Sequence, residues 1–256
     1  MLRALRPYAI SVISVVAGLG IWEIGARNFV DPFFLPPVSA IFLGAVELYH
    51  RGVLFTHIGA SFARILTGFA LGSIVSIPIG LLVGHYLTAR RIIDPYIHFL
   101  RFIPAIALVT LFIVWFGVGE VSKILLVMYA TAFIVIINTA TGVATMHPNK
   151  RLAALTLGAT PWQTFRLVTI PAAVPAIYVG MRLALAGSFM VIVAVEMLAA
   201  ESGIGYLIWT SKLYFRIDWM FVGIFLLGLS GLLTDFVWKQ IGRHVLRRYV
   251  RESANY

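Results

Sequence analysis

The stretch HPNKRLAALTLGATPWQTFRLVTIPAAVP, residues 147–175, decides the fold, because it inserts a polar-edged segment between two long apolar runs. It predicts two short helices that meet at a corner. The first is expected to begin at Pro148, since proline suits the first helical position, and to end near Leu157. Gly158 follows, and glycine readily takes the left-handed conformation found just past a helix end.

The second short helix carries its own start signal. Thr160 and Gln163 stand three residues apart and can form a capping box, in which each side chain accepts from the other residue's backbone N–H group. Pro161 fits the first helical position, and we expect Pro171 and Pro175 to end the helix. A well-capped, polar-edged loop between apolar runs indicates a docking surface on one side of a membrane.

The composition places this loop in an integral membrane protein. Of the 256 residues, 61% are hydrophobic and 12% are charged, and the mean hydropathy is +0.95; a soluble domain is about half apolar and a quarter charged. The net charge of +10 therefore indicates membrane orientation rather than nucleic-acid binding. The sequence has no cysteine, no HExxH motif and no GxxxxGK[ST] phosphate loop, so we expect no metal site and any ATP must bind another chain.

Apolar runs of about 20 residues can cross a bilayer as helices. Six runs predict a single transmembrane domain over residues 1–256, although the run 103–118 is short and must borrow upstream residues or lie partly inside protein. Residues 27–57 are expected outside, with a short interfacial helix over Val38–His50, and 196–218 form a second outside segment, re-entrant or interfacial. The expected spans are 8–26, 65–86, 103–118, 124–146, 176–195 and 219–238.

Lysine and arginine residues are unevenly divided between the two sides. With the N-terminus inside, the inner side holds thirteen: Arg3, Arg6, Arg90, Arg91, Arg101, Lys150, Arg151, Arg166, Lys239, Arg243, Arg247, Arg248 and Arg251. The outer side holds six: Arg27, Arg51, Arg64, Lys123, Lys212 and Arg216. The positive-inside rule then places both termini and the 147–175 loop in the cytoplasm.

Small residues recur every four positions along the run 65–86, at Gly68, Gly72, Ser76, Gly80 and Gly84. Such spacing forms a groove that another helix can approach closely. The stripe serves packing within the chain, or it lies next to a moving element or a subunit contact.

A few polar residues fall within the apolar runs. Arg182 either snorkels or pairs near the cytoplasmic end, or it contacts an anionic substrate or a gate. Glu196 either anchors the outside segment or binds substrate, whereas Asp235 and Lys239, four residues apart, can satisfy each other. Helix-to-helix hydrogen bonds or pathway lining explain the uncharged residues Thr131, Asn138 and Ser188.

Residues 152–177 resemble the EAA motif of permease subunits of type I ABC importers, in which an EAA triplet precedes a glycine and a hydrophobic stretch ending in proline. Leu152 stands where the motif has glutamate. The contact made at this position must therefore be apolar, or a neighbour such as Lys150 or Arg151 must supply its polar part. Residues 94–124, FLPPVSAIF from Phe34 and VEMLAAESGIGYLI from Val195 resemble the nitrate/sulfonate/taurine subgroup. The matching motif residues are Ala153, Ala154, Leu157, Gly158, Ala159, Phe165, Val168, Pro171 and Pro175.

The resemblance implies the MetI-like permease fold in a bacterial cytoplasmic (inner) membrane. It also implies a second permease copy, two ATPase subunits that bind ATP and Mg²⁺, and an extracytoplasmic solute-binding protein. The substrate would be a small anion such as taurine, an alkanesulfonate or nitrate; the alternatives are a vitamin precursor, riboflavin or bicarbonate. The ATPase would contact Leu152, Ala153, Ala154, Gly158, Ala159, Thr160, Pro161, Trp162, Phe165 and Pro171.

Two other classes of protein are weaker readings of the same residues. A stand-alone secondary transporter normally shows internal repeats and a coupling acid in mid-span, and no run has an acid near its centre. An intramembrane enzyme needs clustered histidines or paired carboxylates. Glu23, Glu196 and Asp235 lie near span ends and share no local motif, so the sequence favours a transport subunit without enzymatic activity of its own.

Overall fold

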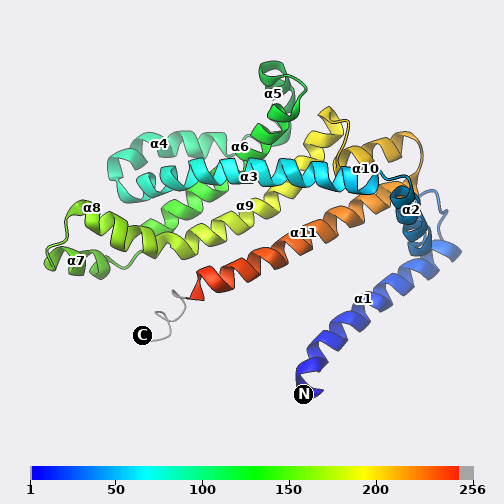
Figure 1. The fold of residues 1–256 in the computed structure, drawn as a ribbon, viewed down its shortest axis with the longest axis horizontal. Helices are drawn as coiled ribbons and strands as arrows, with labels where there is room; N and C mark the ends of the chain where they lie inside the picture. Colours follow the sequence, from blue (N-terminus) through cyan, green and yellow to red (C-terminus); the bar gives the residue numbers. More distant parts are fainter. Residues whose placement is uncertain (1, 248–256) are drawn as a thin grey trace.

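A computed structural model describes residues 2–247, with side chains from residue 10 onward. Arg248 and Arg251 of the charge count lie outside these residues. Within the described part the chain is helical without strands, which confirms the all-α prediction. Figure 1 traces the helices, which are α1 (Leu2–Asn28), α2 (Val38–His50), α3 (Leu54–His85), α4 (Leu87–Leu100), η1 (Ala105–Leu108), α5 (Val109–Phe116), α6 (Glu120–Ala144), α7 (Pro148–Thr156), α8 (Pro161–Thr164), η2 (Phe165–Thr169), α9 (Ile170–Ala199), α10 (Ile204–Leu213) and α11 (Ile217–Val245).

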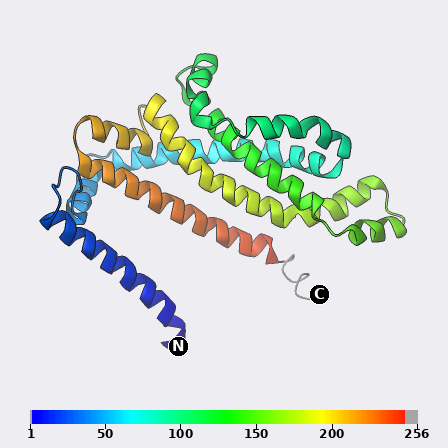
Figure 2. The same ribbon diagram turned by 180° about the vertical axis from the view of Figure 1, so that it is seen from behind.

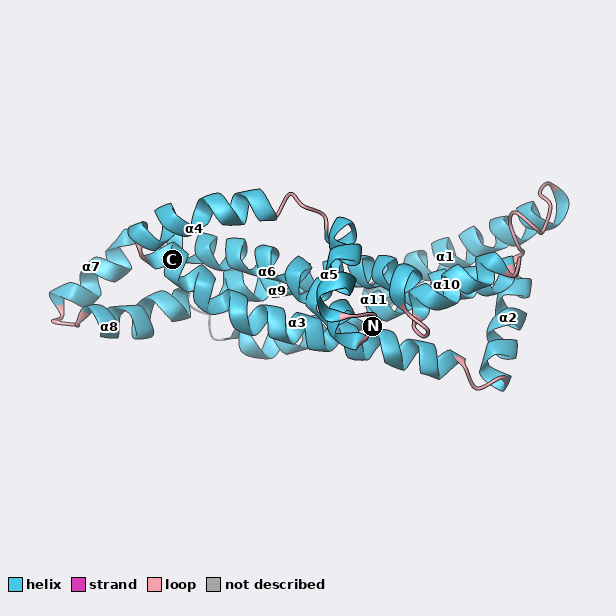
Figure 3. Ribbon diagram, turned by 90° about the horizontal axis from the view of Figure 1, so that it is seen from above, coloured by secondary structure: helices cyan, strands magenta, loops and turns pink. Residues whose placement is uncertain are grey.

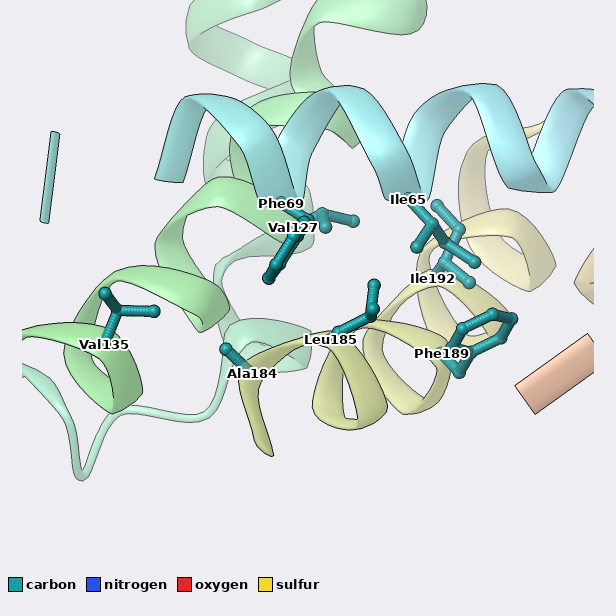
Figure 4. Close-up of a cluster of buried hydrophobic side chains, with 8 residues drawn as sticks. All are labelled: Ile65, Phe69, Val127, Val135, Ala184, Leu185, Phe189 and Ile192. Carbon is teal, nitrogen blue, oxygen red and sulfur yellow. The ribbon is translucent and has the colours of Figure 1, made fainter. Parts of the chain in front are cut away.

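Three long helices, α3, α6 and α9, pack together as the centre of the molecule, and α11 lies along α9 (Figures 1 and 2). At one end lie α2 and α10, and at the opposite end α7 and α8 project beyond the bundle (Figure 3). Helix α1 leaves the bundle near α2. The central contact is a cluster of buried apolar side chains (Figure 4), formed by Ile65, Phe69, Val127, Val135, Ala184, Leu185, Phe189 and Ile192.

The stripe of small residues on α3 faces α6. A Cβ atom built on Gly68 would lie 2.7 Å from Val127 Cβ, and one built on Gly80 would lie 2.6 Å from Thr139 Cβ. Gly72 and Gly84 meet α6 in the same way, and Ser76 is fully buried. Since the contacts advance along both helices together, α3 and α6 run parallel, and the stripe serves packing within the chain.

Five described helical segments are long and apolar enough to cross a membrane: Ile10–Asn28, Leu54–His85, Glu120–Ala144, Pro161–Ala199 and Ile217–Val245. A sixth crossing exists if the bent pair Leu87–Leu100 and Ala105–Phe116 is counted as one broken span. The two halves of that pair meet at 84°. The expected run 103–118 falls almost entirely in the second half, and α4 supplies the upstream residues if the pair is one span.

The second span also begins earlier than hydropathy indicates, at Leu54 instead of Ile65. Two cations assigned to outside loops therefore lie inside helices: Arg64 on α3 and Lys123 on α6, exposed by only 4% and 4%. Their charges are typical of a loop sequence, but both side chains are neutralised: Arg64 pairs with acids on α6 and α9, and Lys123 pairs with Glu120 of its own helix.

Candidate functional site

The loop 147–175 forms two short helices joined at a corner, and we call residues 147–169 the elbow. Helix α7 ends in a Schellman motif, in which Gly158 N donates to Leu155 O and Ala159 N donates to Ala154 O, both at 3.0 Å. Gly158 has a φ of +80°, the left-handed conformation expected from the sequence. This tight closure fixes the direction in which the chain leaves α7.

Helix α8 begins with the expected capping box. Thr160 N donates to Gln163 Oε1 at 2.8 Å, and Gln163 N donates to Thr160 Oγ1 at 3.2 Å. Because these bonds are local, the corner holds its shape without support from the bundle. The elbow is therefore built as a stiff unit.

The expectation that Pro171 and Pro175 end the second helix is wrong. The chain passes from α8 through the π-helical turn η2 into α9, so one apolar helical segment runs over Pro161–Ala199. Pro171 is the second residue of α9, which directly follows the π-helical turn η2. Pro175 lies inside α9, and local π-helical adjustment is one way in which membrane helices accommodate proline.

The elbow joins the bundle through aromatic contacts. The Phe165 ring lies 4.8 Å from the ring of His85 at the end of α3 and 5.8 Å from Trp162. Phe165 and Ile170 also pack against the buried cluster Leu81, Val143 and Ala173. Displacement of α8 must therefore reach α9 and the C-terminal end of α3.

The elbow presents an apolar surface. None of the residues of α7 is buried. Leu152, at the position of the motif glutamate, is 59% exposed, and Leu157 and Trp162 are 88% and 64% exposed. An exposed apolar patch on a projecting segment is typical of a protein–protein contact.

The opposite end of the bundle holds a buried ionic network around Arg64. Its Nε and Nη2 atoms donate to the two carboxylate oxygens of Glu120 at 2.5 and 2.7 Å. Its Nη1 donates to Glu196 Oε1 at 2.7 Å and to Ser202 O at 2.6 Å, and Nη2 also reaches Ser202 Oγ at 3.2 Å. All five guanidinium N–H groups thus have acceptors, drawn from α6, α9 and the segment before α10.

Glu196 is the most deeply buried acid of this network, with no exposed surface. It accepts from Gly205 N at 2.9 Å and from Ser61 Oγ at 2.8 Å, while Ser61 Oγ accepts from Ile204 N at 2.8 Å. Lys123 Nζ donates to Glu120 at 2.9 Å. The two cations balance the two acids, and Glu196 ties α3 and α9 to the start of α10.

The other polar residues named from the sequence also have partners. Arg182 pairs with Asp235 at 2.6 and 3.1 Å, and Asp235 accepts from Lys239 at 2.8 Å. Ser188 Oγ lies 3.2 Å from Thr131 Oγ1 and donates to Ala184 O. Asn138 donates to Ile134 O and packs beside Gly180 of α9. Each lies at a contact between helices, and a pathway role for Asn138, Arg182, Ser188 and Glu196 stays a prediction.

Sequence reasoning missed Arg64, Glu120 and Ser61. The signal available was their position: each stands within a few residues of the outer end of an apolar run, where an acid and a base from different runs can meet. No local motif reports the pairing, because Arg64 and Glu196 are separated by 132 residues.

These features define a multi-pass helical membrane protein with a projecting elbow at one end. Residues 76–249 match the family described as "Binding-protein-dependent transport system inner membrane component", and the chain belongs to that family. It is accordingly the membrane-spanning subunit of an ABC transport system, in which a separate subunit hydrolyses ATP.

Relatives of similar length support this assignment. The taurine transport system permease protein TauC of Escherichia coli (strain K12) is 29% identical over 88% of this chain and 83% of its own length. The formylaminopyrimidine transport permease protein ThiX of Halalkalibacterium halodurans is 30% identical over 90% of each chain. A protein of Bacillus subtilis (strain 168) named for aliphatic sulfonates transport, SsuC, is 34% identical over 90% of this chain and 83% of its own length.

A solved structure shares the fold. An inward-facing chain of the MetNI methionine ABC transporter superposes with a TM-score of 0.68, covering 75% of this chain and 96% of that chain, at 20% identity. The MetI-like fold expected from the EAA resemblance is therefore confirmed.

Proposed function

We propose that this chain forms the translocation pathway of an ATP-driven importer for a small anion, of which taurine and alkanesulfonates are the leading candidates. The names of two relatives, one for taurine and one for aliphatic sulfonates, favour this substrate class. ThiX, named for a formylaminopyrimidine, favours a vitamin precursor as the second candidate.

The observation that carries the coupling proposal is the continuity of the elbow with α9. Because the segment Pro161–Ala199 is one helical unit that reaches the far end of the bundle, a push on α8 moves α9 directly. A flexible connector would absorb the displacement. The ATPase contact is provided by the exposed apolar side chains Leu152, Leu157 and Trp162.

The proposed complex contains two copies of this chain, two ATPase subunits that bind ATP and Mg²⁺, and an extracytoplasmic binding protein. It lies in the bacterial inner membrane with both termini and the elbow in the cytoplasm. The excess of lysine and arginine on the side of the elbow, thirteen against six by sequence, supports this orientation.

The test is co-purification followed by uptake. The tagged permease is extracted in detergent from cells that also express the ATPase and binding protein of the same system, and inverted or sealed vesicles are assayed for labelled taurine. We expect the ATPase to co-purify and taurine uptake to require ATP and the binding protein. Full-rate transport by the reconstituted chain alone, indifferent to nucleotide, would refute the proposal. Uptake of the pyrimidine but not of taurine would select the second candidate.

A further inference from the structure

The break between α4 and η1 interrupts the backbone beside α6, with Arg101, Phe102 and Pro104 exposed on the surface of the single chain. Pro104 has no N–H group, and the chain turns between Arg101 and Ala105. The hydroxyl of Tyr129 on α6 donates to Leu100 O at 2.7 Å and lies 3.3 Å from Ile103 O. Irregular backbone at membrane depth is tolerated where it is buried in protein or lines a water-filled route.

The neighbours of this break place it near the middle of the membrane. Ile97 packs with Val83 and Ile136. Arg101 lies one turn further outward, and Tyr129 contacts the carbonyls on either side of it. Tyr129 is the tenth residue of the 25-residue helix α6, so the break lies about 14 Å from one end of α6 and about 22 Å from the other. Arg101 therefore lies at membrane depth, whereas the sequence pattern places it on the cytoplasmic side.

Arg101 differs from Arg64, Lys123 and Arg182 in having no carboxylate partner among the described residues. Arg64, Lys123 and Arg182 each pair with an acid. The Arg101 side chain is exposed and lies over the Phe102 ring at 4.8 Å from its centroid, a contact that leaves the edge of the guanidinium plane open. Arginines near helix ends can snorkel to the interface, but the end of α4 that Arg101 caps lies beside Tyr129, well inside the length of α6.

A polar stripe leads to Arg101 from the cytoplasmic end. Arg90, Asp94, His98 and Arg101 recur at helical spacing and so share one face of α4. The first three line a cavity of about 280 Å³ that runs along α6 from Ala144 to Ile136. The cavity ends one turn below Arg101, so water can approach it along this face.

A second copy of the chain offers no evident counter-ion at this depth. The sequence contains ten acidic residues. Of those that the structure describes, Glu196 and Asp235 already pair with arginines, and Asp94 pairs with Arg90 at 3.1 Å. The remaining described acids lie toward the outer end. A hydrated anion in transit is the partner that the charge balance favours.

We propose that Arg101, presented at the break between α4 and η1, is an anion-binding residue of the translocation pathway, with the sulfonate or a similar oxyanion group of the solute as its ligand. This inference rests on the proposed function. Tyr129 acts as a positioning residue, because its hydroxyl holds the two carbonyls that fix the break.

Cysteine labelling tests whether Arg101 meets water. The sequence contains no cysteine, so single variants carry one thiol in an otherwise unreactive background. In inverted vesicles holding the full complex, Arg101→Cys should react with a charged methanethiosulfonate reagent, as should His244→Cys at the exposed C-terminal end of α11. Leu232→Cys, at a 69% exposed apolar position in the middle of α11, should not react. An unreactive Arg101→Cys beside a reactive His244→Cys would overturn the inference.

Uptake measurements test whether transport needs the positive charge of Arg101. With subsaturating taurine, Arg101→Gln should reduce ATP-dependent uptake by about tenfold or more, the loss expected for one charged hydrogen-bonding partner. Arg101→Lys should keep a larger part of it, and Tyr129→Phe should lower uptake without removing the charge. If wild-type complexes import taurine and Arg101→Gln does so equally well, the inference fails while the proposed function stands. If the wild type imports no anion, the proposed substrate class itself fails.

Discussion

The two ends of the bundle are stabilised by different kinds of interaction. At the end near α10, buried charges from α3, α6 and α9 share hydrogen bonds with one another and with the segment before α10. At the elbow end, α7 has no buried residue, and the shape depends on caps between residues at most five apart. One end is held together by long-range contacts, whereas the other is presented as a stiff projection.

This difference indicates how motion can enter the molecule. The elbow can be displaced with few tertiary contacts to break, and α9 carries the displacement. At the far end, the same helix is fixed to α3 and α10 through Glu196. The outer parts of α3, α6, α9 and α10 should therefore move as one body.

The largest expected effect follows from breaking the ionic network. Arg64→Met leaves Glu196 buried without its cation, and loss of one partner of a buried pair costs about 3–5 kcal/mol. We expect a marked fall in the thermal unfolding temperature of the purified complex, measured in detergent. Glu196→Gln should cost less, because the amide oxygen can still accept from Gly205 N and Arg64 keeps Glu120.

The double variant Arg64→Met with Glu196→Gln is the matched control. It removes both buried charges, so it should recover part of the stability lost by Arg64→Met alone. Equal stability of the single and double variants would show that the charge on Glu196 contributes nothing at this end.

A smaller effect is expected where α3 and α6 meet. Gly80→Ala would place its Cβ 2.8 Å from the backbone oxygen of Ile136, so the helices must separate, at a cost of about 1–3 kcal/mol. Gly228→Ala on α11 meets nothing within 4 Å and should leave stability unchanged or slightly raised. Thermal unfolding of both variants checks the contrast, and equal unfolding temperatures would mean that α3 and α6 can separate freely.

At the elbow, the expected effect is on coupling more than on stability. Gly158→Val forces a β-branched residue to φ +80°, at about 1–2 kcal/mol, although its side chain would meet no neighbour. The relaxed corner should lower taurine uptake per ATP hydrolysed in vesicles. Gly158→Asn, which tolerates this conformation, should retain most coupling. If the two variants couple uptake to ATP hydrolysis equally well, the left-handed geometry at residue 158 is not needed for coupling.

The sequence predicts the elbow better than the network because of the range of the interactions. Gly158, Thr160 and Gln163 act on residues within five positions, so the pattern and the structure coincide. Arg64 looks like a loop residue until its acids are located 56 and 132 positions away. No local pattern contains that information.

The broken span shows the same limit. Pro104 and the short run 103–118 indicate an interruption, but the depth of Arg101 follows only from the contact between Tyr129 and the break. Likewise, the local sequence predicts that Pro171 and Pro175 end a helix, but the helical segment continues through both from α8 into α9.

The smallest expected effect concerns Glu47, which joins α2 to the start of α11 beside the outer network. The hydrogen bond from Arg216, at 2.6 Å, lowers the pKa of Glu47 from 4.5 to about 2, with Arg51 adding to the shift against partial desolvation. The unfolded chain therefore takes up this proton first as the pH falls. The contribution of Glu47 is complete above pH 4.5, declines between pH 4.5 and 2, and is absent below. Because the side chain is partly exposed, the contribution should be small. Thermal unfolding of wild type and Glu47→Gln, compared across this range, isolates it from the other acids: the difference between the two should shrink as the pH approaches 2. A difference that stays constant with pH would show that Arg216 holds α2 by the geometry of its hydrogen bonds, whatever the charge on Glu47.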